Sequence, residues 1–93
     1  MAIQSFRCNE TWSIFLGLPV NRFNSIRSAA ERKLQMLDDA IELRDLRSSP
    51  SNRLEQLAGN RSGQHSIRVN DQWRVCFVWG FNGPEQLEIV DYH

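Results

Sequence analysis

Long hydrophobic runs, a cysteine framework and an excess of one charge are all missing from this sequence of 93 residues. No run approaches the roughly 18 apolar residues of a membrane span, and the N-terminus lacks the basic and then apolar pattern of a signal peptide. We therefore expect a cytoplasmic protein with no membrane partner. Eleven basic and eleven acidic residues cancel, which argues against a protein held to nucleic acid by its overall field.

Metal ligands and phosphate loops are equally scarce. The sequence contains two cysteines and two histidines, and Cys8, Cys76, His65 and His93 show no spacing typical of a zinc site or a disulfide framework. The segment GNRSG at 59–63 lacks the strand-to-helix context and the lysine of a phosphate-binding loop. We expect no metal and no cofactor.

Hydrophobic periodicity predicts one α+β domain over residues 1–93, with an N-terminal strand and helices packed on one face of an antiparallel sheet. The strongest signal lies at 22–37, where apolar residues recur every three or four positions, and Asn21 or Asn24 is the expected cap. Beyond Asn52 the period changes to two. The expected elements are a strand at 2–7, a short helix or turn at 10–18, a helix at 22–37 and, after a break at Asp38-Asp39, a shorter helix at about 41–46. Strands are expected at 53–57, 64–69, 73–81 and 86–90.

Strand alternation indicates which side chains meet. In the strand from Trp73, apolar residues at alternate positions form a bed for the helices, and the opposite face carries Arg74. Arg68 of the preceding strand takes the same open face, so we expect Arg68 and Arg74 to meet there. His65 is expected on the apolar face as a hydrogen-bonded structural residue, and Trp12 is expected in the core.

Arginine dominates the basic residues, with ten of the eleven. Between Arg44 and Arg74 six arginines stand against three acids. Because arginine presents a planar fork of donors that matches phosphate oxygens, a local anion site is compatible with overall neutrality.

The chain ends in LEIVDYH, a short strand followed by Asp91, Tyr92 and His93. With Arg68 and Arg74 these residues supply cations for a phosphate, groups that exchange protons and an aromatic ring that stacks on a base. Such a set is suited to metal-independent RNA cleavage. The residues alone leave a second interpretation open, in which the arginines are exposed strand cations and His93 is a solvated terminal residue.

Two stretches carry a family resemblance: GNRSGQHSIRVNDQWRVCFVW followed by VDYH, and the upstream AERKLQMLDDAIELRDLRSSPSNRLEQLAG. Together they resemble the HigB host-inhibition toxins of the RelE/ParE superfamily over nearly the whole chain. The resemblance implies a RelE-like fold and a toxin of a type II toxin-antitoxin system that cleaves messenger RNA in the ribosomal A site. It also implies a HigA-like helix-turn-helix antitoxin, which contacts operator DNA, so that the toxin meets DNA only indirectly.

Carried over by position, the resemblance makes Arg74 the phosphate-stabilising arginine and Asp91, Tyr92 and His93 the active-site ending. In some family members a histidine and a lysine precede the glycine that is Gly59 here, whereas this chain has Glu55 and Ala58. Glu55 is then a candidate base or a charge that opposes phosphate. Arg53, Arg61 and Arg68 are the expected RNA-binding cations, and we expect weaker activity than in more basic relatives.

Two alternatives remain at this point. A gyrase-poisoning toxin of the ParE branch shares the fold, although the DYH ending speaks against it. A non-catalytic module that only binds RNA or the antitoxin is the other.

Overall fold

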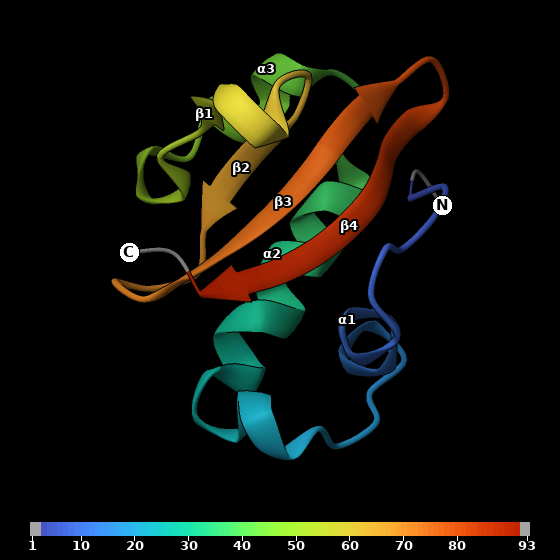
Figure 1. Cartoon of the computed structure of the whole chain (residues 1–93), viewed down its shortest axis with the longest axis vertical. Helices are drawn as coiled ribbons and strands as arrows, with labels where there is room; N and C mark the ends of the chain where they lie inside the picture. The colour runs from blue at the N-terminus through green and yellow to red at the C-terminus, as the bar shows by residue number, and fades with distance from the viewer. Residues whose placement is uncertain (1–2, 92–93) are drawn as a thin grey trace.

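The computed structural model describes residues 3–91 as a four-stranded sheet with helices packed behind it (Figure 1). None of the helices in these residues is long and apolar enough to cross a bilayer. In chain order the elements are α1 (Asn9–Phe15), the 3-10 helix η1 (Asn21–Ile26), α2 (Arg27–Asp39), α3 (Leu43–Arg47), η2 (Pro50–Asn52), β1 (Glu55–Gln56), η3 (Gly59–Arg61), β2 (His65–Arg68), β3 (Trp73–Gly80) and β4 (Gly83–Asp91).

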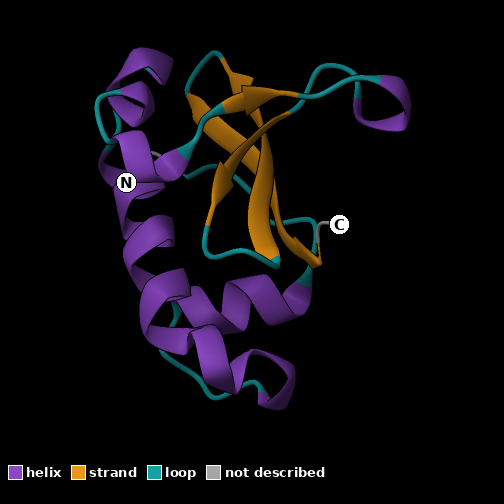
Figure 2. Cartoon of the chain, turned by 90° about the vertical axis from the view of Figure 1, so that its left-hand side faces the viewer, coloured by secondary structure: helices purple, strands orange, loops and turns teal. Residues whose placement is uncertain are grey.

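The sheet is an antiparallel meander in the order β1-β2-β3-β4, as predicted, and the helical layer lies on one side of it (Figure 2). Phe77 and Val75 of β3 are fully buried against that layer, which contributes Phe23 and Leu34. Trp73 meets Phe23 edge to face, with ring centroids 5.3 Å apart. The alternation of β3 therefore sets one face to the core, and the α+β prediction is confirmed.

The predicted helix at 22–37 has a different start. Its first turns form the 3-10 helix η1, and the α-helical geometry begins at Arg27. Neither Asn21 nor Asn24 caps it, because the residue before α2 is Ile26 and no side chain there bonds to the first turn. The predicted break at the aspartate pair is confirmed, since α2 ends at Asp39.

The predicted strand at 2–7 is wrong as a regular strand. The segment from residue 3 runs parallel to β4 with a single bridge between Phe6 and Leu87, and residue 2 lies outside the described part. Gln86 has a φ of 54° and donates its backbone N–H to the Ser5 hydroxyl, at 2.9 Å, instead of to a backbone carbonyl. This left-handed residue interrupts the ladder that a strand requires.

Other boundaries also shift. The first meander strand shrinks to the two residues of β1, because Arg53 takes a left-handed conformation at φ 45°. The last turn lies at Phe81 and Asn82, so that β4 already begins at Gly83, which pairs with Gly80 of β3. Trp12 is half exposed, contrary to the core prediction, because α1 turns Thr11 and Ile14 inward instead.

His65 lies on the apolar face, as predicted, with its ring stacked on Phe77 at 6.1 Å. The predicted hydrogen bond is wrong for Nδ1, which is buried and has no partner among residues 3–91. Burial lowers the pKa of His65, and the charge of Arg47 lowers it further.

Candidate functional site: an arginine face on the sheet

Arg74 lies on the sheet face opposite the helices, because β3 carries its side chain away from them. The residue is only 6% exposed. Its Nε donates to the Ser66 hydroxyl at 2.7 Å, and its Nη2 donates to the Arg53 carbonyl at 2.6 Å and to the Ser66 carbonyl at 3.3 Å. A carboxylate oxygen of Glu55 lies 3.4 Å from the same Nη2. A buried arginine fixed by several acceptors is a preorganised cation, which is what stabilisation of growing phosphate charge requires.

The backbone that carries the Arg53 carbonyl follows η2, and hydrogen bonds of Asn52 fix η2 to the helices. Asn52 is fully buried; its Oδ1 accepts a hydrogen bond from Lys33 Nζ at 2.6 Å, and its Nδ2 donates to the Leu46 carbonyl at 2.9 Å. Burial lowers the pKa of Lys33, with smaller contributions from Arg32 and Arg68. These bonds fix η2, and η2 fixes the backbone that receives Arg74.

Arg68 stands directly opposite Arg74 in the register of β2 and β3, as the alternation predicts. Its Nη2 forms an ion pair with Asp71 in the turn between the two strands. Asp71 is almost completely exposed, so this carboxylate is free to move with the turn. The two arginines therefore share one face, each beside a carboxylate.

A second row crosses the same face one step further along the strands. Ser66, Cys76 and Glu88 are register partners, and Glu88 Oε1 lies 3.3 Å from Arg61 Nη1 of η3. Burial raises the pKa of the Cys76 thiol, while the charge of Arg61 opposes the shift, Glu88 adds to it and Arg74 opposes it. Both cysteines are free thiols.

The ending of the chain is only partly described. Asp91 is the last residue of β4 and pairs with Trp73, so the register sets it on the helical side of the sheet. Its Oδ2 accepts a hydrogen bond from Gln72 Nε2 at 3.1 Å. Tyr92 and His93 lie outside the described residues. The structure thus brings Arg74, Arg68, Arg61 and Glu55 to one face, adds the Arg53 backbone, and sets Asp91 apart from them.

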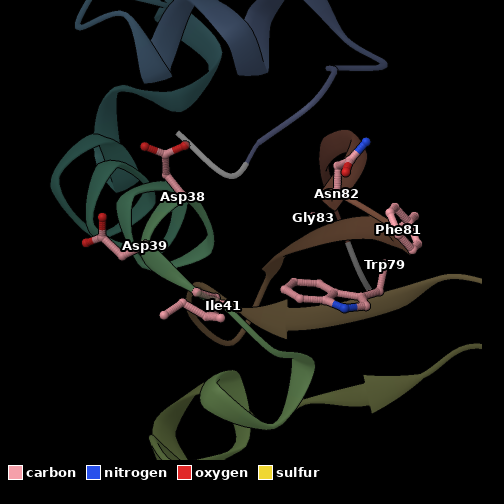
Figure 3. Close-up of a pocket in the computed structure, with 8 residues that line it drawn as sticks. Asp38, Asp39, Ile41, Trp79, Phe81, Asn82 and Gly83 are labelled. Carbon is pink, nitrogen blue, oxygen red and sulfur yellow. The ribbon is translucent and has the colours of Figure 1, made fainter.

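A different hollow lies at the other end of the sheet, between the end of α2 and the hairpin of β3 and β4 (Figure 3). Its apolar lining includes Ile41, Trp79 and Phe81, and its charged lining residues are Asp38 and Asp39. Two carboxylates with no cation among the lining residues repel phosphate. The chemistry of phosphate binding therefore belongs to the arginine face and not to this hollow.

Sequence reasoning missed three residues that organise the face: Ser66, Asn52 and Lys33. A serine between His65 and Ile67 of a strand carries no signal of its own, and its position opposite Cys76 depends on the register. Asn52 and Lys33 are 19 positions apart, so their hydrogen bond depends on the packing of η2 against α2. The sequence did contain one indication: strand alternation places Ser66 on the same face as Arg74.

Solved structures show the class of fold. The chain is similar to a chain of the YoeB-YefM complex from Staphylococcus aureus, with a TM-score of 0.58 and 19% identity, over 98% of this chain and 94% of that chain. This likeness confirms the predicted fold, in which helices pack on one face of an antiparallel sheet.

Curated relatives are similar over shorter stretches. Toxin HigB-1 of Vibrio cholerae serotype O1 is 52% identical over 56 residues, which are 60% of this chain and 59% of that protein. An uncharacterized protein of Haemophilus influenzae is 41% identical over 56 residues, which are 60% of this chain and 55% of that protein. The aligned stretch therefore spans less than two thirds of either relative.

A family model covers more of the chain. The model of the HigB-like toxins, described as the RelE-like toxin of the type II toxin-antitoxin system HigB, matches residues 19–93. The chain belongs to this family, and the resemblance found in its sequence is confirmed.

Proposed function

We propose that this chain is a ribosome-dependent endoribonuclease that cleaves messenger RNA and so inhibits translation. The observation that carries the proposal is the buried side chain of Arg74, whose guanidinium is fixed by Ser66 and the Arg53 carbonyl on the sheet face opposite the helices. Membership of the HigB-like toxins supports it. Work on the ribosome is consistent with a cytoplasmic location.

In this reaction the 2'-hydroxyl of one nucleotide attacks the adjacent phosphate. A new bond forms from the 2'-oxygen to phosphorus, the bond from phosphorus to the 5'-oxygen breaks, and the products are a 2',3'-cyclic phosphate and a 5'-hydroxyl. A base takes the proton of the 2'-hydroxyl, an acid protonates the leaving oxygen, and a cation stabilises the extra negative charge. Arg74 is the cation of this proposal.

Four groups are proposed for the proton transfers and for base stacking. Glu55 lies at the rim of the face, with one oxygen 3.4 Å from Arg74 Nη2, which makes it a candidate base. The family ending assigns the remaining transfers to Asp91 and His93 together, although the register sets Asp91 on the helical side of the sheet. It assigns to Tyr92 the stacking on a base or its orientation. No step in this scheme requires a metal.

The partner we propose is a HigA-like helix-turn-helix antitoxin that neutralises the toxin and contacts operator DNA in its place. The second proposed partner is the ribosome, whose A site holds the message that is cleaved. Operator DNA then meets this chain only through the antitoxin.

The test uses the purified protein in a reconstituted translation system, with new 5' ends of the message mapped at each time point. Arg74→Ala is expected to slow cleavage by about 10²- to 10³-fold, the usual effect of removing one preorganised donor. Arg44→Ala is the matched control, because Arg44 is an exposed arginine paired with Glu42 away from this face. His93→Gln is expected to abolish cutting while retaining antitoxin binding.

Four results would contradict the proposal. Equal cleavage of naked RNA and translated message would remove the role of the ribosome, and full activity of Arg74→Ala would remove the site. Growth arrest with intact messages and damaged DNA would favour the gyrase-poisoning alternative. RNA binding without any cut would favour the non-catalytic module.

A further inference from the structure

A polar hollow of about 310 Å³ lies on the same sheet face as Arg74, at Glu88 of β4. Its lining comes from four separate parts of the fold: Arg7 from the segment before α1, Asn60 and Arg61 from η3, Gln64 before β2, and Glu88 from β4. These residues offer two guanidinium groups, two amides and a carboxylate. Such a mixture of donors and acceptors matches the edge of a nucleobase better than it matches a phosphate alone.

The centre of this hollow is already ordered. Arg61 Nη1 donates to Gln64 Oε1 at 3.2 Å and lies 3.3 Å from Glu88 Oε1. The side chains of Arg61 and Glu88 are 34% and 28% exposed, so the ion pair is partly shielded from water. Preorganised polar groups lose little entropy when a ligand arrives.

The rim of the hollow has groups that remain available to a ligand. Within residues 3–91, the side chains of Arg7 and Asn60 form no hydrogen bond and no ion pair, and Glu88 Oε2 accepts none. Arg7 is exposed at the entrance. A phosphate at the entrance and a base against Glu88 would together use these groups.

The hollow is one row of side chains away from the proposed cleavage centre. Glu88 pairs with Cys76, Cys76 pairs with Ser66, and the Ser66 hydroxyl holds Arg74 Nε. Successive side chains on one face of a strand are about 6.6 Å apart, which is short enough for neighbouring nucleotides of one extended strand to occupy the two positions.

We propose that this hollow reads the base of a nucleotide next to the cleaved phosphate, and that it favours guanine through Glu88. The inference rests on the proposed function. Guanine presents two adjacent N–H donors and a carbonyl oxygen along one edge, which match the carboxylate of Glu88 and the remaining N–H groups of Arg61 or Gln64. Adenine, cytosine and uracil do not offer two adjacent donors on that edge, so they leave one carboxylate oxygen without a partner.

The first experiment measures cleavage preference. A message library with every base at each codon position is translated with wild-type protein, and the 5' ends are counted. Guanine is expected to be enriched at one fixed position beside the cut, and Glu88→Gln is expected to reduce that enrichment at least about fivefold, the lower limit for one bidentate base contact. Glu85→Gln is the matched control, since it removes another β4 carboxylate that does not line the hollow.

The second experiment separates this inference from the cleavage reaction. Guanosine 5'-monophosphate and adenosine 5'-monophosphate are titrated into the protein, and NMR shifts are followed for the amides of Asn60, Arg61 and Gln64. Guanosine monophosphate is expected to bind at least about fivefold more tightly, and Glu88→Gln is expected to bring the two affinities together. Gln64→Ala takes the place of Glu88→Gln if the latter unfolds.

The outcomes are distinct. Equal binding of the two nucleotides, or an unchanged preference in Glu88→Gln, would overturn the guanine site and reduce the pair of Arg61 and Glu88 to a fold contact. Absence of cutting together with selective guanosine monophosphate binding would overturn the proposed function and leave the guanine site standing.

Discussion

Replacement of Asn52 by leucine is the sharpest test of how the face is built. Leucine has a similar size, so the change removes polar atoms without opening a large cavity. The structure gives Asn52 three contacts: Lys33 Nζ at 2.6 Å, the Leu46 carbonyl at 2.9 Å and Met36 Sδ at 3.1 Å. All three join η2 to the helical layer.

The magnitude follows from the atoms left behind. A hydrogen bond from a charged group contributes about 1.5–3 kcal/mol, and an unpaired buried carbonyl costs about 1–3 kcal/mol. Asn52 is fully buried and Lys33 is nearly so. Leucine recovers part of the loss through its own burial, so we expect a net loss of about 3 kcal/mol in the free energy of unfolding. This is a large share of the 5–15 kcal/mol typical of a domain.

The assay is urea unfolding, followed by tryptophan fluorescence, of wild type and four variants: Asn52→Leu, Lys33→Met, the double variant and Ser51→Ala. Ser51→Ala is the mild control, because its hydroxyl lies 3.4 Å from Lys33 Nζ and is not the main acceptor. The double variant is expected to show a coupling of about 1.5–3 kcal/mol between Asn52 and Lys33. A loss below about 1 kcal/mol for Asn52→Leu, or the same loss with and without Lys33, would refute this reasoning.

Two further predictions concern His65 and Glu55. Because the folded-state pKa of His65 is lowered, its neutral form stabilises the fold above the unfolded pKa of about 6.5, and this contribution is lost as the pH falls below that value. The urea midpoint of unfolding should therefore decrease when the pH is lowered from 7.5 to 5.5. In His65→Phe the midpoints at the two pH values should differ less. Glu55→Gln is expected to slow single-turnover cleavage by about 10²-fold or more, as for loss of a base, while RNA binding tightens because a carboxylate leaves the side of Arg74; an unchanged rate would rule out Glu55 as the base.

The sequence was most informative where the strand period decides the outcome. Alternation from Trp73 set Val75 and Phe77 on the helical side and Arg74 on the other, and the register confirms that Arg68 stands opposite Arg74. This part succeeds because a strand has only two faces and a large apolar surface admits only one of them inside.

The rest depended on contacts between distant residues. The stretch before Arg53 reads as a polar connector, yet Asn52 is fully buried because Lys33, 19 positions earlier, supplies a donor for it. The left-handed turns at Arg53 and Gln86 likewise break strands that local propensity favours. Arginine and glutamine do not indicate a positive φ, because asparagine and glycine are the usual residues at such positions.

The neutral charge of the chain also has a local explanation. Three arginines of the face each lie beside a carboxylate: Arg74 beside Glu55, Arg61 beside Glu88 and Arg68 beside Asp71. On the proposed function, a phosphate competes with these carboxylates for the same guanidinium groups, so naked RNA gains little on binding. The carboxylates differ in exposure, since Glu55 is 47% exposed and Asp71 is 99% exposed, whereas Glu88 is 28% exposed.

On the proposed function, the exposure of each carboxylate determines whether it can leave its arginine when RNA binds. Glu55 and Asp71 can turn toward solvent when a phosphate arrives, and each then loses only a weak surface ion pair. Glu88 is held by Arg61 and is less exposed. In the proposed base-reading role it stays in place and contacts the base instead of the backbone. On the proposed function, a message fixed by the ribosome does not depend on the global field of the toxin, and the paired arginines would restrict cleavage to RNA that the ribosome presents.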